Sequence, residues 1–173
     1  MDKILIAYYS RRGENYVGGI IKELPVGNTE IIAKKISECI NADIFRIDTV
    51  KQYPKNYTET TNMAMLELNS NVRPELASSI NNIDEYGTIL LGYPNWWGTM
   101  PMCVCTFLES YDLSGKIILP FCTHEGSALG HSEKDIKRLY PTSDIRKGLA
   151  IRGSNVKNAD TQVKTWLKDN KLI

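Results

Sequence analysis

Residues 88–101 read TILLGYPNWWGTMP, and this stretch decides the fold. Its first six residues form a short, continuous apolar run, which is typical of a strand covered on both faces of a sheet. The Pro, Gly and Trp residues that follow predict a loop, because they punctuate regular structure. The stretch therefore predicts a buried strand that ends in a loop rich in Trp and Gly.

The same apolar pattern recurs along the chain, with helical spacing between the runs. Further buried strands are predicted at 3–8, at 116–122 and at 149–151 with a lead-in from 145, and the alternating run 43–48 predicts a strand nearer an edge. Apolar residues at helical spacing follow the cap residues Asn28 and Thr29 as far as Cys39 and predict the first helix. Four more helices are predicted at 58–69, 102–111, 132–139 and 159–168.

The order of these elements determines the fold class. Strands and helices alternate, which predicts an α/β fold with a five-stranded parallel sheet between two helical layers, three-layer and doubly wound. A length of 173 residues favours a single domain, 1–173. In such sheets ligands bind beyond the carboxyl ends of the strands, so function is expected after Tyr8, Tyr93 and Cys122.

Composition and charge exclude several classes of function. The 21 basic and 20 acidic residues give a net charge of +1 and are interspersed, without the basic stripe of a nucleic-acid binder. The apolar run 4–9 is too short for a signal peptide, and no run approaches the roughly 18 residues of a membrane helix. We expect no nucleic acid or membrane partner and a cytoplasmic location, in which Cys39, Cys103, Cys105 and Cys122 stay free thiols.

The segment after the first predicted strand carries groups that favour an anion. Ser10, Arg11 and Arg12 follow the strand, and Asn28 and Thr29 open the helix beyond a long insert. Backbone amides converge at a helix N-terminus, where the helix dipole adds about half a positive charge. A plain turn with an N-cap explains Asn28 and Thr29 but not Ser10 and Arg12, so a phosphate is favoured.

Two adjacent tryptophans stand on the loop that follows the third strand. Pro94 and Gly98 frame this loop, in which Trp96 and Trp97 follow Asn95. Neighbouring side chains of an irregular loop cannot easily enter the same core pocket, and two exposed indoles are costly. We expect one indole to pack on the following helix and the other to face a flat partner.

The loop after the fourth strand, 123–130, is short, polar and rich in glycine. Its glycines allow backbone to approach a ligand closely, and its amides and hydroxyls can bond a polar ring edge. His124 could donate a proton there, but a solvent-facing loop histidine is the favoured interpretation.

Motifs that mark catalysis, nucleotide hydrolysis or metal binding are incomplete. Gly19 stands where a P-loop needs Lys, and Lys134 stands where a nucleophile elbow needs Gly. No second His follows His124 at the zinc-protease spacing, and Cys103 and Cys105 are too close in sequence for a zinc pair. We therefore predict no catalytic residue and no metal site, and interpret Cys103 and Cys105 as core thiols.

The motifs YYSRRGENY (8–16), LPVGNTE (24–30), GYPNWWGTMP (92–101), FCTHEGSALG (121–130) and GLAIRG (148–153) together resemble the flavodoxin-like family. The resemblance covers essentially the whole chain and is closest to the branch with a long insert in the phosphate loop. It implies strand order 2-1-3-4-5 and non-covalent binding of FMN.

The resemblance also implies which residues bind the cofactor. The phosphate would contact residues of the first segment, and the ring would lie between the loops after the third and fourth strands, stacked on Trp96 or Trp97. The implied set is Ser10, Arg11, Arg12, Asn28, Thr29, Pro94, Asn95, Trp96, Trp97, Gly98, Thr123, His124, Glu125, Gly126, Ser127 and Gly130.

Three functions remain open at this point. The favoured one is a flavodoxin-type redox protein that passes electrons to redox partner proteins or small acceptors. An alternative is an FMN-dependent NAD(P)H reductase of quinones or nitroaromatics, in which the segment 53–74, with Tyr53, Tyr57 and Arg73, builds a substrate pocket. A third is an FMN-binding scaffold that acts through a protein contact.

Overall fold

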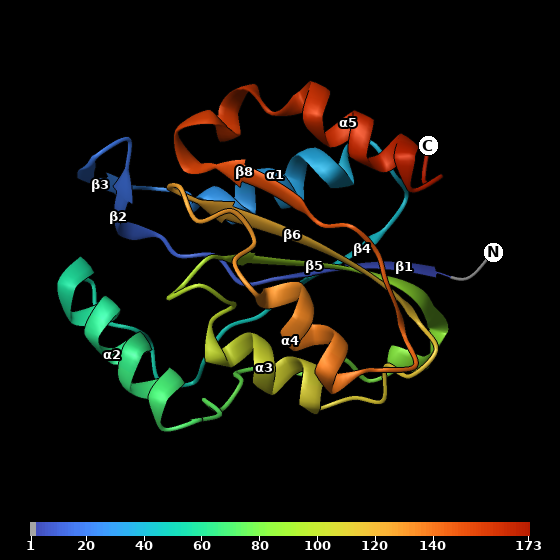
Figure 1. Ribbon diagram of the computed structural model, residues 1–173, viewed down its shortest axis with the longest axis horizontal. Coiled ribbons are helices and arrows are strands. Elements are labelled where there is room, and N and C mark those ends of the chain that lie inside the picture. The colour runs from blue at the N-terminus through green and yellow to red at the C-terminus, as the bar shows by residue number, and fades with distance from the viewer. Residues whose placement is uncertain (1–2) are drawn as a thin grey trace.

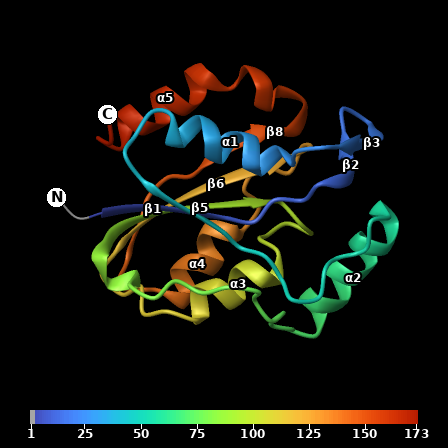
Figure 2. The ribbon, with the colours of Figure 1, turned by 180° about the vertical axis from the view of Figure 1, so that it is seen from behind.

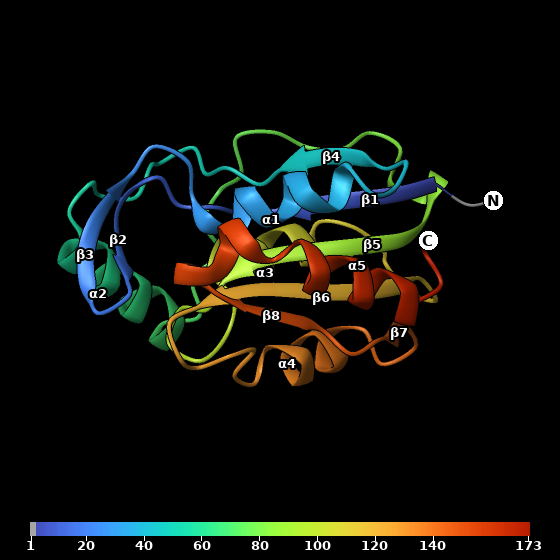
Figure 3. The same cartoon turned by 90° about the horizontal axis from the view of Figure 1, so that it is seen from above.

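The computed structural model describes residues 3–173 and is built on one parallel sheet. Its strands, in chain order, are β1 (Lys3–Tyr8), β4 (Asp43–Arg46), β5 (Tyr86–Pro94), β6 (Ile117–His124), the short β7 (Asp144–Ile145) and β8 (Leu149–Arg152). The order across the sheet is β4-β1-β5-β6, after which β7 and β8 both pair with β6 (Figure 3). Counting β7 and β8 as one interrupted strand, this confirms the predicted order 2-1-3-4-5.

Helices cover both faces of the sheet, as predicted. The helices α1 (Asn28–Ser37) and α5 (Asp160–Asp169) lie on one face, and α3 (Met102–Glu109) and α4 (Ser132–Leu139) lie on the other (Figure 1). The reverse view shows the same three layers (Figure 2). The helix α2 (Tyr57–Asn69) lies beyond the carboxyl ends of the strands, and two 3-10 helices, η1 (Ile83–Glu85) and η2 (Gly153–Asn158), flank the sheet.

Alternate residues of the central strand fill two apolar cores. Leu91 and Tyr93 of β5 pack toward α3 and α4, whereas Leu90 packs with Ile32 of α1. The continuous apolar run recognised in the sequence is thus buried on both faces. Gly92 keeps β5 close to its neighbour, because a Cβ there would lie 2.2 Å from the ring of Phe121.

The insert after β1 departs from expectation, because the sequence predicted no strand in it. It forms an antiparallel hairpin of β2 (Gly13–Val17) and β3 (Ile20–Leu24). Gly18 and Gly19 make its turn, with positive φ angles of 61° and 90° that favour glycine. The Gly-Gly pair between apolar dipeptides is a hairpin signal that the sequence contained. The sequence also did not predict the two 3-10 helices or the interruption between β7 and β8, and the ends of the other elements shift by up to two residues.

Several sequence expectations concern the chemistry of the fold as a whole. No helix within residues 3–173 is both long and apolar enough to cross a membrane. The four cysteines are free thiols, and Cys103 and Cys105 are buried in the core as predicted. Within the same described range, no cluster of His, Cys, Asp and Glu has the arrangement of a metal site.

Candidate functional site

Two adjoining cavities lie at the carboxyl edge of the sheet, where the loops after β1, β5 and β6 meet. The first, which we call the cradle, has a volume of about 120 Å³. It is lined by Arg11, Asn15, Tyr16, Asn28, Thr29, Tyr57, Pro94, Asn95, Trp96, Thr123, His124 and Glu125. The second, the side pocket, has a volume of about 380 Å³ and continues from the cradle toward α2. Arg11, Asn15, Tyr57, Asn95 and Trp96 line both cavities.

The N-terminus of α1 forms one end of the cradle. Thr29 is buried there, and its hydroxyl lies 2.7 Å from that of Thr123 on β6. The amide of Glu30 donates to Ser10 Oγ at 3.0 Å, and the amide of Ile31 begins the helical ladder. The earlier amides of the helix have no carbonyl within the helix to bond. Together with the threonine hydroxyls they can bind an anion.

Neither Ser10, whose hydroxyl bonds the first turn of α1, nor Arg12 lines the cradle. Both line a different cavity on the far side of the loop, together with Arg46. Glu30 accepts hydrogen bonds from Arg12 at 3.3 Å and from Arg46 at 2.7 Å. Burial works to raise the pKa of Glu30, but hydrogen bonds from Lys34 and Arg46 outweigh it and hold the pKa below its ordinary value. The two arginines therefore neutralise a carboxylate outside the cradle.

Arg11 joins the insert to the turn that precedes α2. Its guanidinium donates to the carbonyl oxygens of Glu14 at 2.9 Å, Pro54 at 2.9 Å and Lys55 at 2.8 Å. Glu14 accepts from the Tyr57 amide at 2.6 Å and so caps α2. Arg11 lines the cradle, but three of its N–H groups hold the insert against the turn before α2. We call the insert and α2 together the outer wall of the site.

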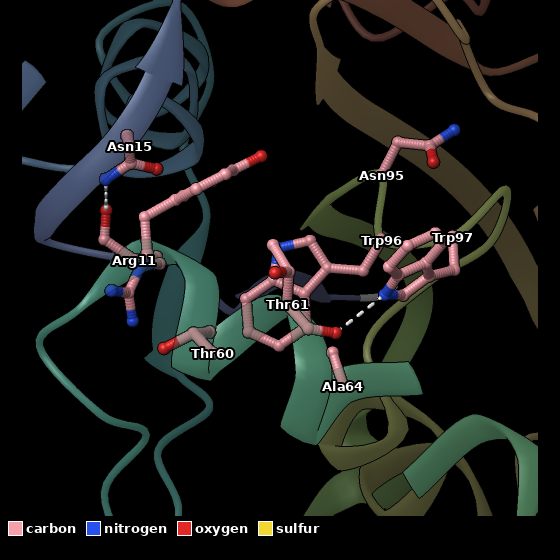
Figure 4. Close-up of a pocket in the computed structure, with 9 residues that line it drawn as sticks. Arg11, Asn15, Thr60, Thr61, Ala64, Asn95, Trp96 and Trp97 are labelled. Carbon is pink, nitrogen blue, oxygen red and sulfur yellow. Dashed lines mark hydrogen bonds between the residues drawn. The ribbon is translucent and has the colours of Figure 1, made fainter. Parts of the chain in front are cut away.

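The outer wall contains residues that the sequence did not identify. The side pocket is lined by Asn15, whose amide donates to the Arg11 carbonyl oxygen at 3.1 Å, and by Thr60, Thr61 and Ala64 of α2 (Figure 4). Tyr16 stacks on Tyr57, with ring centroids 6.3 Å apart. Of the segment expected to build a substrate pocket, only Tyr57 and its helix contribute. Tyr53 lies beneath Trp96, and Arg73 pairs with Glu109.

The two tryptophans of the 94–98 loop behave differently. Trp96 is half-buried and meets Tyr9 and Tyr53 edge-on, at centroid distances of 5.4 and 5.0 Å. It therefore packs against these tyrosines and against the apolar core that includes the residues of α3. Trp97 is 48% exposed, and its indole N–H donates to Thr61 O of α2 at 2.9 Å (Figure 4).

Trp97 also has an unusual backbone conformation. Its φ is 55° and that of Gly98 is 84°, and hydrogen bonds in both directions join Trp96 to Thr99. These features fit a type I′ turn, which suits Asn or Gly better than Trp at its first central position. A bulky residue held in this region stores strain, and such strain concentrates at functional sites.

The loop after β6 interlocks with the tryptophan loop. Asn95 donates from its backbone to Thr123 O at 2.8 Å and from its side chain to Ala128 O at 2.9 Å. A Cβ on Gly130 would lie only 2.0 Å from Gly98 O, so the two backbones meet where only glycine fits. Gly98 and Gly130 thus shape the loops without lining either cavity. Gly126 and Ser127 are exposed and also lie outside both linings.

His124 and Glu125 line the cradle from the same loop. Burial, aided by the charge of Arg152, lowers the pKa of His124, and its Nδ1 accepts the Gly126 amide at 2.9 Å. Glu125 accepts the Gly18 amide of the hairpin turn on Oε2 at 3.0 Å. Its Oε1 is buried and has no hydrogen-bond partner within residues 3–173. This oxygen requires a donor, which a bound ligand with a hydroxyl or N–H group would supply.

A doubly wound sheet of this order, with a cradle shared by the loops after its first, third and fourth strands, defines a flavodoxin-like protein. The chain belongs to the flavodoxin family, because the family model described as Flavodoxin matches residues 3–170. No curated protein is similar enough in sequence to count as a match.

Solved structures agree with this assignment. A candidate flavoprotein from Bacteroides eggerthii is 26% identical with a TM-score of 0.80, and the similarity covers 100% of both chains. A flavoprotein from Lactobacillus acidophilus, solved in complex with FMN, is 20% identical with a TM-score of 0.67 and 96% and 99% coverage. An NADH:FMN oxidoreductase is 11% identical with a TM-score of 0.58 and 98% and 89% coverage. The last two comparisons show a shared fold.

Proposed function

We propose that the protein binds FMN non-covalently in the cradle and works as a flavodoxin-type electron-transfer protein. The observation that carries the proposal is that the two adjoining cavities bring together the α1 N-terminus, Glu125 and the aromatic side chains of Trp96 and Trp97. FMN has a phosphate, which suits the helix N-terminus, and a flat ring, which suits the aromatic side chains. When bound, FMN supplies the redox chemistry, and the protein supplies binding, orientation and electrostatics.

Each lining residue has a binding role in this proposal. The amides of Asn28 and Thr29 and the hydroxyl of Thr123 bind the phosphate. Trp96 and Trp97 cover the ring and exclude water, and the unpartnered oxygen of Glu125 accepts a hydrogen bond from a hydroxyl or N–H group of the cofactor. Ser10 acts indirectly, because its hydroxyl holds the first turn of α1 in place. No residue is assigned a catalytic acid or base role.

The family assignment and the FMN-bound structure of the Lactobacillus acidophilus protein support FMN as the cofactor. The free thiols agree with a reducing compartment, and the proposal includes a cytoplasmic location with redox proteins or small acceptors as partners.

An absorption spectrum tests the cofactor directly. Purified protein is mixed with FMN, desalted and examined for a bound flavin spectrum, with riboflavin, which lacks the phosphate, as the matched ligand. We expect FMN to stay bound and riboflavin to bind more weakly. Protein that remains colourless after desalting would contradict the proposal. Stepwise anaerobic reduction of the loaded protein then shows whether electrons enter singly or in pairs.

The side pocket favours a second candidate function, an FMN-dependent NAD(P)H reductase of quinones or nitroaromatics. Trp97, Tyr57 and α2 enclose about 380 Å³ beside the cradle, within the range of small-molecule sites. Anaerobic mixing of the yellow protein with NADH or NADPH separates the two candidates. Fast bleaching supports the reductase, whereas flavin that stays oxidised until a partner reductase is added supports the electron carrier.

A further inference from the structure

A third cavity adjoins the α1 end of the cradle and has no role in the proposed function. This lysine groove, of about 710 Å³, lies between the β2–β3 hairpin, α1 and η2. Its apolar lining includes Val17, Leu24 and Val156, and its charged residues are the four lysines Lys22, Lys34, Lys35 and Lys157 and one acidic residue, Glu38. Asn28, at the first turn of α1, lines both this groove and the cradle. The two cavities therefore meet at the end of the cradle that would hold the phosphate.

Glu125 forms the partition between the cradle and the lysine groove. Consecutive residues of β2 straddle this boundary, since Tyr16 lines the cradle and Val17 lines the groove. The amide of Gly18 then donates to Glu125 Oε2 and closes the boundary on the hairpin side. On the other side, a Cβ on Gly153 would lie 2.4 Å from Glu125 Oε1 and 2.5 Å from Asn28 Nδ2. The carboxylate is thus wedged between the hairpin and the start of η2.

The charges of the groove suit a phosphate-bearing ligand. Lys34 pairs with Glu30 at 3.0 Å and Lys35 with Asp160 at 2.7 Å. Lys22 and Lys157 have no ion-pair partner in the part of the chain that the structure describes. Two available ammonium groups beside an apolar lining match the phosphates and the base of an adenine nucleotide.

We infer that Glu125 is a specificity-determining residue that ends the cradle at FMN and excludes the adenylate half of FAD. FAD is FMN joined through its phosphate to AMP, so its extra nucleotide must continue beyond the α1 end of the cradle. The lysine groove is the cavity that would receive it, and the Glu125 side chain closes the passage by its position. This inference rests on the proposed function for the orientation of the flavin in the cradle.

Glu125→Ala tests the partition, with Glu125→Gln as the matched control that keeps the size of the side chain and its acceptor for Gly18. Dissociation constants for FMN and FAD are measured by flavin fluorescence for each variant. In the wild type, FMN should bind more tightly than FAD. In Glu125→Ala, the affinity for FAD relative to FMN should rise by at least about tenfold, a change equivalent to about 1.4 kcal/mol. In Glu125→Gln it should change by less than about threefold, since the partition stays in place.

A second measurement does not depend on flavin binding. ADP is titrated into flavin-free Glu125→Ala and wild-type protein by calorimetry. The variant should bind ADP more tightly, and adding Lys22→Ala and Lys157→Ala should remove the gain. Glu133→Ala is the control for this measurement. The Glu133 carboxylate also accepts a hydrogen bond from a backbone amide, that of Gly148, and its deletion should leave ADP binding unchanged. An unchanged ADP affinity in Glu125→Ala, or an FAD preference that shifts equally in Glu125→Gln, would overturn the inference. If the proposed function itself is wrong, neither FMN nor FAD binds to the protein, whereas Glu125→Ala still raises the affinity for ADP.

Discussion

The two walls of the cradle are held in place by different means. The tryptophan loop, 94–99, is closed by backbone hydrogen bonds between Trp96 and Thr99 and is locked against the loop after β6 by close backbone contact at Gly130. The β2–β3 hairpin instead depends on side chains that reach across the chain, from Arg11 to Lys55 and from Glu125 to Gly18. One wall is a preformed, strained turn, whereas the other is a cover fastened by a few distant contacts.

This difference teaches which wall can adapt to a ligand. Backbone contacts as close as that between Gly98 and Gly130 cannot lengthen without disrupting both loops. A hairpin held by side chains can move when one of those side chains finds another partner, and its β3 strand is largely exposed. We expect the tryptophan loop to set the geometry of the flavin ring and the hairpin to respond to what binds beside it.

The largest effect is expected where the two strand-end loops interlock. Gly130→Ala places a Cβ against Gly98 O at a residue with φ of 54°, and we expect a loss of about 3 kcal/mol in the free energy of unfolding. Gly115→Ala is the matched control, because its φ is 74° but no atom lies within 4 Å of the new Cβ. It should cost only about 1 kcal/mol. Denaturant titration measures both, and equal losses would show that the loops are not locked.

The second prediction addresses the fastening of the hairpin. Arg11→Ala leaves the carbonyl oxygens of Glu14, Pro54 and Lys55 without their donor, which should cost about 2 kcal/mol of unfolding free energy. Hydrogen exchange should accelerate in the hairpin and at the start of α2 but not in the 94–99 loop. Arg138→Ala removes an exposed partner of Asp135 and should change stability by less than about 0.5 kcal/mol. If hydrogen exchange accelerated equally in the hairpin and in the 94–99 loop, the two walls would not differ in how they are held in place.

The same distinction explains what the sequence could predict. Apolar runs and helical spacing are local signals, so the strands of the parallel sheet, the five α-helices and the sheet order were predicted correctly, whereas the β2–β3 hairpin was missed. The meeting of the three loops also follows from topology alone. The α2 segment was expected at a pocket only in the reductase alternative, and Asn15 was not expected there. Both are brought to the cavity by contacts of Arg11 and Glu14 with a turn 43 residues away, which no local pattern reveals. For the same reason Arg12 was expected at the phosphate, although its hydrogen bond to Glu30 holds it elsewhere, beside Arg46.

The third prediction separates the two tryptophans within the rigid wall. Trp97→Ala should weaken FMN binding by about 2 kcal/mol, taking the scale of base–aromatic stacking, with a smaller effect on folding because the indole is largely exposed. Trp96→Ala should lower the free energy of unfolding of the flavin-free protein more than Trp97→Ala does, since it removes the aromatic contacts with Tyr9 and Tyr53 and leaves a cavity. Flavin titration and denaturation of the flavin-free variants give both quantities. If neither variant changes flavin affinity, neither indole touches the ring.

The smallest effect is a pH dependence in the loop that joins the two walls. Burial and then the charge of Arg152 lower the pKa of His124 below the value of about 6.5 that it has in the unfolded chain. The folded protein therefore binds fewer protons than the unfolded chain, and the contribution of His124 to stability is complete above about pH 6.5 and is lost as the pH falls toward the folded value. Protonation also removes the Nδ1 acceptor of the Gly126 amide, so exchange of that amide should accelerate over the same range. Arg152→Ala should shift this transition to higher pH, and His124→Gln should abolish it. The backbone of Thr123, next to His124, accepts the amide of Asn95. If the pH-dependent acceleration of amide exchange extends from Gly126 into the 94–99 loop, the tryptophan loop depends on the protonation state of His124.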